Sequence, residues 1–95
     1  MDKKEILKNL KSNKQNFKSN FHLAKIGLFG SFARGEAANT SDIDIIVKFD
    51  KPIGWDFIIL KEYLEDILNR EVDLVTEEAI KLQMKKGILK EVIYI

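Results

Sequence analysis

Apolar residues recur at helical spacing in several parts of the chain. The clearest pattern predicts a helix over residues 56–69, with an apolar stripe made of Phe57, Leu60, Leu64, Ile67 and Leu68. A weaker stripe predicts a helix over residues 3–18. Thr76 can cap a further helix over residues 77–86, which Gly87 can interrupt.

Alternation with a period of two marks the strands. Over residues 42–49 it separates a core face from a second face: Ile43, Ile45, Val47 and Phe49 against Asp42, Asp44, Ile46 and Lys48. Residues 71–75 repeat the pattern, with Val72 and Leu74 opposite Glu71, Asp73 and Val75. Residues 24–29 read as a short buried strand, and the apolar tail over residues 88–95 fits either a helix or a strand.

The order of these elements predicts an α/β fold, in which a small mixed β-sheet carries helices packed on one face. Between the first two strands, Gly30 to Gly35 leaves room for about one helical turn, with Gly35 in the usual glycine position past a helix end. Residues 36–41 and 50–54 are predicted to be loops.

Length and charge narrow the class of protein. The chain has 95 residues, which fits a single domain over residues 1–95. Its net charge of +1 gives no case for direct nucleic-acid or membrane binding. It has no cysteine, no apolar run long enough to cross a bilayer, and an amphipathic start in place of an apolar signal region. We therefore expect a cytoplasmic protein without thiolate metal sites.

Asp42 and Asp44 are the first candidates for chemistry. Two residues apart on one strand face, their backbones lie roughly 6–7 Å apart, and their charges repel unless a cation lies between them. Hard divalent ions such as Mg²⁺ prefer carboxylate oxygens, and two-metal phosphoryl transfer uses carboxylates that bridge the ions. Asp73 is the best third ligand because it leaves the next strand opposite Val72 and Leu74; Glu71 is the alternative.

Gly30 and Ser31 are the second candidates, because a glycine and a serine follow a strand where a short helix begins. Gly30 would allow a triphosphate to approach the backbone N–H groups, and the Ser31 hydroxyl would add a donor. Arg34 lies one turn later and could hold the triphosphate with a permanent positive charge. Taken alone, Arg34 could also pair with Glu36 or Asp42, and Ser41 with Asp42 could be a plain turn cap.

Together, the residues Gly30-Ser31-Phe32-Ala33-Arg34-Gly35 and Ser41-Asp42-Ile43-Asp44 closely resemble the signature of the DNA polymerase β-like nucleotidyltransferase superfamily. The short length and Glu71-Val72-Asp73-Leu74-Val75 after one long helix resemble its minimal branch, the MNT domains. The resemblance covers residues 24–95.

The resemblance implies a polymerase β-like nucleotidyltransferase fold and a site that binds ATP and two Mg²⁺ ions. Asp42, Asp44 and Asp73 would be the catalytic metal ligands, and Gly30, Ser31, Arg34 and Ser41 would bind the nucleotide. Asp73 would also help to activate the acceptor hydroxyl.

The resemblance also implies a partner. Many minimal members are encoded beside a helical HEPN toxin, which they contact as an antitoxin and modify by transferring AMP to a tyrosine. This chain would then form a hetero-oligomer with such a toxin. Two alternatives stay open: an antitoxin that neutralises its partner by binding alone, or transfer of AMP to the hydroxyl of a small molecule.

Other residues have ordinary interpretations. Lys48 could contact a phosphate, but more often such a lysine balances local negative charge. His22 has no partner at metal-site spacing and is expected to be exposed. Trp55 and Phe57 are expected in the core or at a partner contact, and the tail over residues 88–95 at a subunit interface or in the core.

Overall fold

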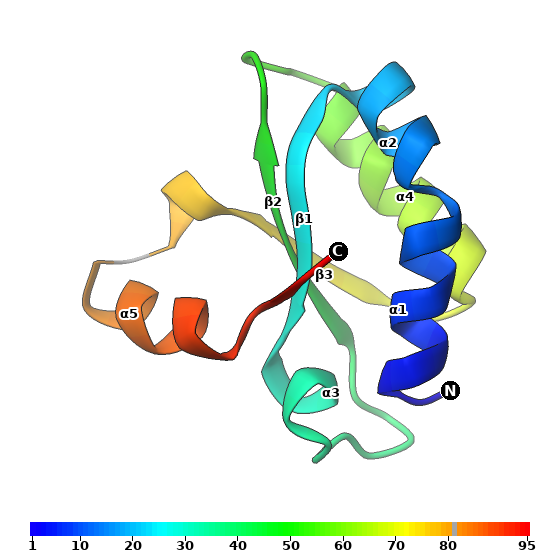
Figure 1. The fold of residues 1–95 in the computed structure, drawn as a ribbon, viewed down its shortest axis with the longest axis vertical. Helices are drawn as coiled ribbons and strands as arrows, with labels where there is room; N and C mark the ends of the chain where they lie inside the picture. The colour runs from blue at the N-terminus through cyan, green and yellow to red at the C-terminus, as the bar shows by residue number, and fades with distance from the viewer. Residues whose placement is uncertain (81) are drawn as a thin grey trace.

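Four strands form a single mixed sheet in the order β3-β2-β1-β4 (Figure 1). The computed structural model describes residues 1–80 and 82–95. Its strands are β1 (Leu23–Phe29), β2 (Ile43–Phe49), β3 (Val72–Thr76) and β4 (Ile93–Tyr94). Its helices are α1 (Lys3–Ser12), α2 (Lys14–Phe21), α3 (Gly30–Arg34), α4 (Asp56–Leu68), the 3₁₀ turn η1 (Glu77–Ala79) and α5 (Leu82–Glu91). None of these helices is long and apolar enough to span a bilayer.

The strand directions follow from the connections. The antiparallel neighbours β1 and β2 are joined through α3 and its loop, whereas β2 and β3 are parallel and are joined by a crossover through α4. The short β4 pairs antiparallel with the other edge of β1. The predicted mixed α/β sheet is therefore confirmed.

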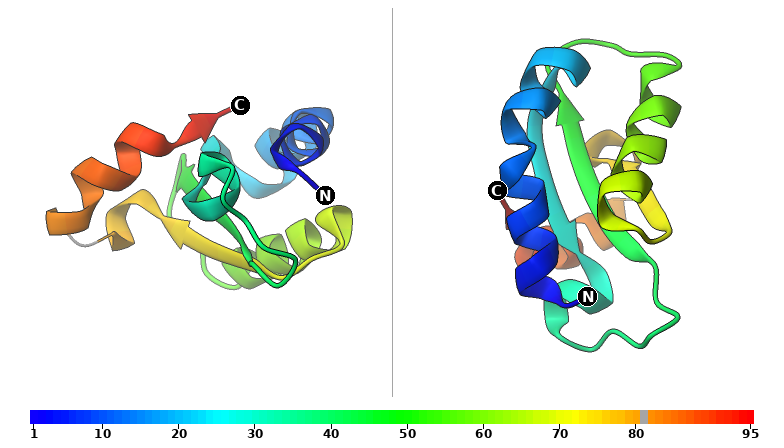
Figure 2. Two further views of the ribbon diagram at one scale, coloured as in Figure 1. Left: turned by 90° about the horizontal axis from the view of Figure 1, so that it is seen from below. Right: turned by 90° about the vertical axis from the view of Figure 1, so that its right-hand side faces the viewer.

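The core lies on one face of the sheet, beneath α1, α2 and α4 (Figure 2). The face that alternation predicted is confirmed in β2, where Ile43, Ile45 and Val47 are fully buried. The stripe of α4 meets them through Leu60 and Leu64, which are also fully buried. These contacts hold the sheet against the helices. They do not involve the second face of β2, which carries Asp44.

The second face differs from expectation at Ile46, which is fully buried although it shares that face with Asp44. Ile46 pairs with Gly27 of β1, and a Cβ added to Gly27 would lie 2.5 Å from Cγ1 of Val92. The C-terminal segment thus packs closely over this part of the second face. The end of the face that carries the aspartates stays open, since Asp42 and Asp73 are exposed.

The predicted helix over residues 3–18 is in fact two helices, which are separated at Asn13. The Asn13 side chain donates to the Asn9 carbonyl at 2.8 Å and accepts from the Tyr63 hydroxyl at 2.6 Å. This tertiary bond to α4 therefore lies where the chain passes from α1 to α2. The second helix ends at Phe21, where His22 adopts a left-handed conformation and is half-buried, so its predicted exposure is wrong.

The prediction of a helix over residues 77–86 is also wrong in its bounds. The Thr76 hydroxyl caps only η1, by accepting from the Ala79 N–H at 3.2 Å, and Ile80 is then extended. The helix α5 begins later and continues through Gly87 to Glu91. The tail over residues 88–95, for which the sequence left helix and strand open, contains the end of α5 followed by the strand β4.

Candidate functional site

The two aspartates on neighbouring strands meet at one end of the sheet. Asp44 of β2 pairs directly with Asp73 of the parallel strand β3, so their side chains leave the same face side by side. Asp42 comes two residues before Asp44, where the chain enters β2, and both Asp42 and Asp73 are exposed. Because parallel strands start at the same edge, the fold brings the three predicted carboxylates to one open end of the second face.

The Asp44 carboxyl lies in an unfavourable electrostatic environment. The pKa of this carboxyl is raised to about 6. Partial burial is the largest cause, the neighbouring carboxylates of Asp73 and Asp42 also raise the pKa, and Arg34 opposes the increase. A cation bound beside these carboxylates would relieve the repulsion among them. The site is therefore ready to receive positive charge.

This environment predicts that Asp44→Asn stabilises the metal-free protein at neutral pH. The pKa of Asp44 is raised from 3.8 to about 6, so its contribution to stability is complete below about pH 4 and is lost as the pH rises through about 6. The full shift corresponds to ~3 kcal/mol, and solvent screening of this half-exposed group reduces the expected gain for Asp44→Asn to about 1 kcal/mol.

Urea unfolding with a chelator present measures this effect at about pH 4 and at about pH 7.5. The variant and the native protein should agree at the lower pH and differ at the higher one. Asp66→Asn, on the exposed side of α4, is the matched control and should show no such difference. Equal stability of native protein and Asp44→Asn at both pH values would contradict the prediction.

Gly30 shapes the space beside Asp44. It has a φ of +74°, and a Cβ added to it would lie 2.0 Å from the Asp44 Oδ2. Only glycine fits here, both for the backbone and for the close approach of the carboxylate. Gly35, with a φ of +75°, ends α3 as the sequence predicted.

The donor set suits a hard divalent cation. Across residues 1–80 and 82–95, no three histidine or acidic side chains are arranged closely enough to enclose a metal ion. Asp44 and Asp73 nevertheless offer adjacent carboxylate oxygens, the ligands that Mg²⁺ prefers, and the missing side chain of Gly30 makes room for the Asp44 carboxylate. The chemistry of these residues fits Mg²⁺, and Asp42 is near enough in sequence to join them.

Arg34 and the Gly30 N–H share one partner, the Glu91 carboxylate. The Gly30 N–H donates to Glu91 Oε1 at 3.1 Å, and Arg34 donates to both carboxylate oxygens at 3.3 and 3.1 Å. Arg34 also pairs with Glu36, at 3.5 Å, which is one of the two alternative partners that the sequence left open for it. The hydrogen bond to Glu91 is the main reason that the pKa of Arg34 is raised above its ordinary value.

Sequence reasoning missed Glu91, because nothing local marks a glutamate near the end of an apolar tail. It also missed Arg70, which donates to the carbonyls of Ala38, Asn39 and Ser41 and so holds the loop before Asp42. The guanidinium of Arg70 lies 5.1 Å from the centre of the Phe32 ring, which ties that loop to α3. A basic residue directly before the 71–75 strand was the only available signal.

The surroundings of Ser41 and Lys48 bear on two further predictions from the sequence. The Ser41 hydroxyl accepts from the Ala38 N–H at 2.9 Å, which is the plain turn contact left open by the sequence. Lys48 lies on the Asp44 face but four residues further along β2, roughly 13 Å away, and so ordinary charge balance is its better interpretation. Glu71 precedes β3 and lines a cavity of about 200 Å³ together with Ser41 and Asp42.

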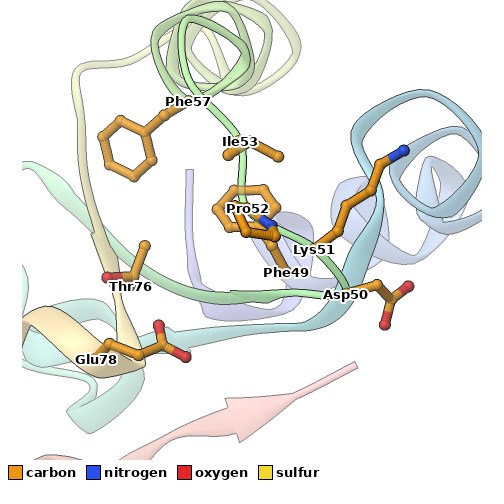
Figure 3. A pocket seen from close by; sticks show the side chains of 8 residues that line it. All are labelled: Phe49, Asp50, Lys51, Pro52, Ile53, Phe57, Thr76 and Glu78. Carbon is orange, nitrogen blue, oxygen red and sulfur yellow. The ribbon is translucent and has the colours of Figure 1, made fainter.

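A larger cavity, of about 430 Å³, opens at the opposite end of β2 (Figure 3). Phe49, Phe57 and Thr76 are among the side chains that line it. Phe49 lies five residues beyond Asp44, roughly 16 Å along the strand, so this cavity is separate from the carboxylates. Trp55 lies in the sequence between two residues that line this cavity, Ile53 and Phe57. Its side chain is 79% exposed, which excludes the core position considered for it.

Comparison with known proteins agrees with this geometry. Residues 4–95 match the family described as the nucleotidyltransferase domain. The protein adenylyltransferase MntA of Thermococcus cleftensis is 42% identical over 92 residues, which cover 96% of this chain and 93% of that protein.

Solved structures give the same result for the fold. A structure described as a candidate minimal nucleotidyltransferase superposes with a TM-score of 0.82 at 32% identity, covering 98% of this chain and 95% of the other. A toxin–antitoxin crystal structure with AMP-PNP superposes with a TM-score of 0.70 at 25% identity, covering 99% of this chain and 72% of the other. On its fold, its family match and its near full-length relatives, this chain belongs to the nucleotidyltransferase domain family.

Proposed function

We propose that this chain transfers AMP from ATP to a hydroxyl of a partner protein, with Asp42, Asp44 and Asp73 as the catalytic metal ligands. The observation that carries the proposal is the pairing of Asp44 with Asp73 across two parallel strands, with the Asp44 carboxylate close against the backbone of Gly30. The similarity to a protein adenylyltransferase supports AMP as the transferred group. The similarity to a structure that contains AMP-PNP supports ATP as the donor.

Each side chain has a defined task in this reaction. Asp42, Asp44 and Asp73 would hold two Mg²⁺ ions, which supply charge neutralisation for the reacting phosphates when bound. The Gly30 N–H, the Ser31 hydroxyl and Arg34 bind and orient the triphosphate tail. Asp73 is exposed and therefore accessible to an acceptor, from which it takes the hydroxyl proton.

The bond changes are those of an in-line displacement. The acceptor oxygen forms a bond to the α-phosphorus, and the bond from that phosphorus to the bridging oxygen of the β-phosphate breaks. Pyrophosphate leaves with its charge balanced by Arg34. AMP stays on the acceptor as a phosphodiester.

The acceptor in this proposal is a tyrosine of a helical HEPN toxin, for which this chain is the antitoxin in the cytoplasm. A toxin–antitoxin structure is among the similar folds. At the start of α4, Trp55, Ile58 and Ile59 are 79%, 45% and 50% exposed, and such apolar exposure is typical of a surface that contacts another protein. The residues 1–95 would then act as a single minimal domain that relies on its partner to supply the acceptor.

A variant pair tests the proposal. With ATP labelled at the α-phosphate, Mg²⁺ and the helical protein encoded beside this chain, the native protein should label its partner. Asp73→Asn should slow labelling by about 100-fold, because it removes both a metal ligand and the proton acceptor. Mass spectrometry of the partner should show the added mass of AMP on a tyrosine.

Glu71→Gln is the matched control, since Glu71 is the other acid next to this strand and is exposed like Asp73. It should retain labelling within about threefold. ATP labelled at the γ-phosphate should leave the partner unlabelled. A larger loss for Glu71→Gln than for Asp73→Asn would reject Asp73 as the third ligand, and an unlabelled partner would reject the proposed reaction.

A further inference from the structure

The Glu91 carboxylate already occupies the groups assigned above to the triphosphate tail. Its Oε1 accepts from the Gly30 N–H at 3.1 Å, and both of its oxygens accept from Arg34, at 3.3 and 3.1 Å. A carboxylate is planar and a phosphate is tetrahedral, but both are anions whose oxygens accept hydrogen bonds from N–H groups. The two groups can therefore bind to the same donors. The free protein therefore carries its own anion at this position.

Glu91 lies at a boundary between a firmly held segment and a loosely held one. After it, β4 pairs with β1, the Ile95 N–H donates to the Ile26 carbonyl, and the Tyr94 hydroxyl donates to Glu77 at 2.7 Å. Before it, none of the residues from Leu82 to Glu91 is buried, although α5 ends beside α3 (Figures 1 and 2). The Glu91 side chain can thus leave its partners without disturbing the core.

The charge balance also favours exchange with a ligand. The side chains of Arg34 and Glu91 are 45% and 25% exposed, so water partly screens the ion pair between them. Breaking this ion pair therefore requires little free energy. A triphosphate carries more negative charge than one carboxylate and would satisfy the same donors. An uncharged ligand would gain nothing from them.

We propose that Glu91 is an internal competitor for the triphosphate, holding the Gly30 N–H and Arg34 in the free protein and yielding both when the nucleotide binds. This inference rests on the proposed nucleotide site. Glu91 thereby sets how much phosphate charge a ligand needs in order to bind. It keeps α3 and Arg34 ordered between reactions, and it weakens binding of ligands that lack a phosphate tail able to replace it.

Calorimetric titration with AMP-PNP and Mg²⁺ tests the proposal on the whole chain. Glu91→Gln should bind about fivefold more tightly than the native protein, because the neutral amide competes less well for Arg34. Glu36→Gln is the matched control: it removes the other acid that pairs with Arg34, at 3.5 Å, and Glu36 has no hydrogen bond to Gly30 among the described contacts. This control should change the affinity by less than about twofold.

The outcomes separate the two proposals. Equal or weaker binding by Glu91→Gln, with binding by the native protein intact, would overturn the competitor role and leave the proposed function standing. An equal gain in Glu36→Gln would also overturn it, since general charge would then suffice. If neither the native protein nor Glu91→Gln binds AMP-PNP, both proposals fail.

Hydrogen–deuterium exchange supplies a second measurement that needs no variant. When AMP-PNP and Mg²⁺ bind the native protein, amides of residues 30–35 should become more protected, while those of residues 88–92 should exchange faster as Glu91 is released. Increased protection of both segments would contradict the release of Glu91.

Discussion

Replacing Asp42 and Asp44 together by Asn is expected to abolish AMP transfer while leaving the protein folded. Neither substitution changes the size of the side chain, and Asp42 is exposed, so the core on the other face of β2 is undisturbed. The variant loses two of the three carboxylates proposed to hold the metal ions. Several kcal/mol of charge stabilisation depend on such ions, so we expect a rate at least about 1,000-fold lower.

The measurement is labelling of the partner by ATP labelled at the α-phosphate, together with a thermal unfolding curve for each protein. The double variant Asp50→Asn/Asp66→Asn, at two exposed positions outside the site, removes the same charge and should retain the rate. Full transfer by the Asp42/Asp44 variant would reject the proposed mechanism.

The same variant separates catalysis from simple binding as the basis of any antitoxin action. If AMP transfer neutralises the partner, cells that produce the toxin with the Asp42/Asp44 variant should fail to grow. If this variant protects them as well as the native protein does at equal protein levels, binding alone is sufficient. The exposed apolar residues at the start of α4 would then be the part of the chain to examine.

Gly30→Ala is expected to damage both stability and activity. The backbone cost of an alanine at a φ of +74° is about 1 kcal/mol, and the new Cβ would lie 2.0 Å from Asp44 Oδ2 and 2.8 Å from Asp44 Cγ. The Asp44 carboxylate must then move away from Gly30, which changes its placement beside Asp73. We expect a total loss of about 2–3 kcal/mol in the free energy of unfolding and at least a hundredfold, ~3 kcal/mol, loss of transfer rate.

Gly35→Ala provides a close control, because Gly35 has almost the same φ, +75°, but a Cβ there meets nothing within 4 Å. It should therefore lose only the backbone term, about 1 kcal/mol, and keep most of its activity. Urea unfolding and the transfer assay together measure both effects. Equal activity of the two variants would show that the space beside Asp44 has no role.

Features that depend on local periodicity could be predicted from the order of residues alone. The alternation over residues 42–49 assigned Ile43, Ile45 and Val47 to the core and Asp44 to the opposite face, because side chains on any strand alternate whatever its neighbours are. The position of Gly35 predicted the end of α3 for a similar reason: few other residues adopt a positive φ at low cost.

Contacts between residues from distant parts of the chain, in contrast, follow from the way the whole chain packs. The register of β2 against β3 pairs Asp44 with Asp73 and not with Glu71. Alternation along the strand favoured Asp73 but could not establish this pairing. At Asn13, where the first predicted helix divides, the side chain accepts a hydrogen bond from Tyr63 of α4. Glu91 reaches Gly30 across 61 residues of sequence, because β4 returns to the edge of β1. Such contacts depend on how the whole chain packs, so no local pattern of polar and apolar positions contains them.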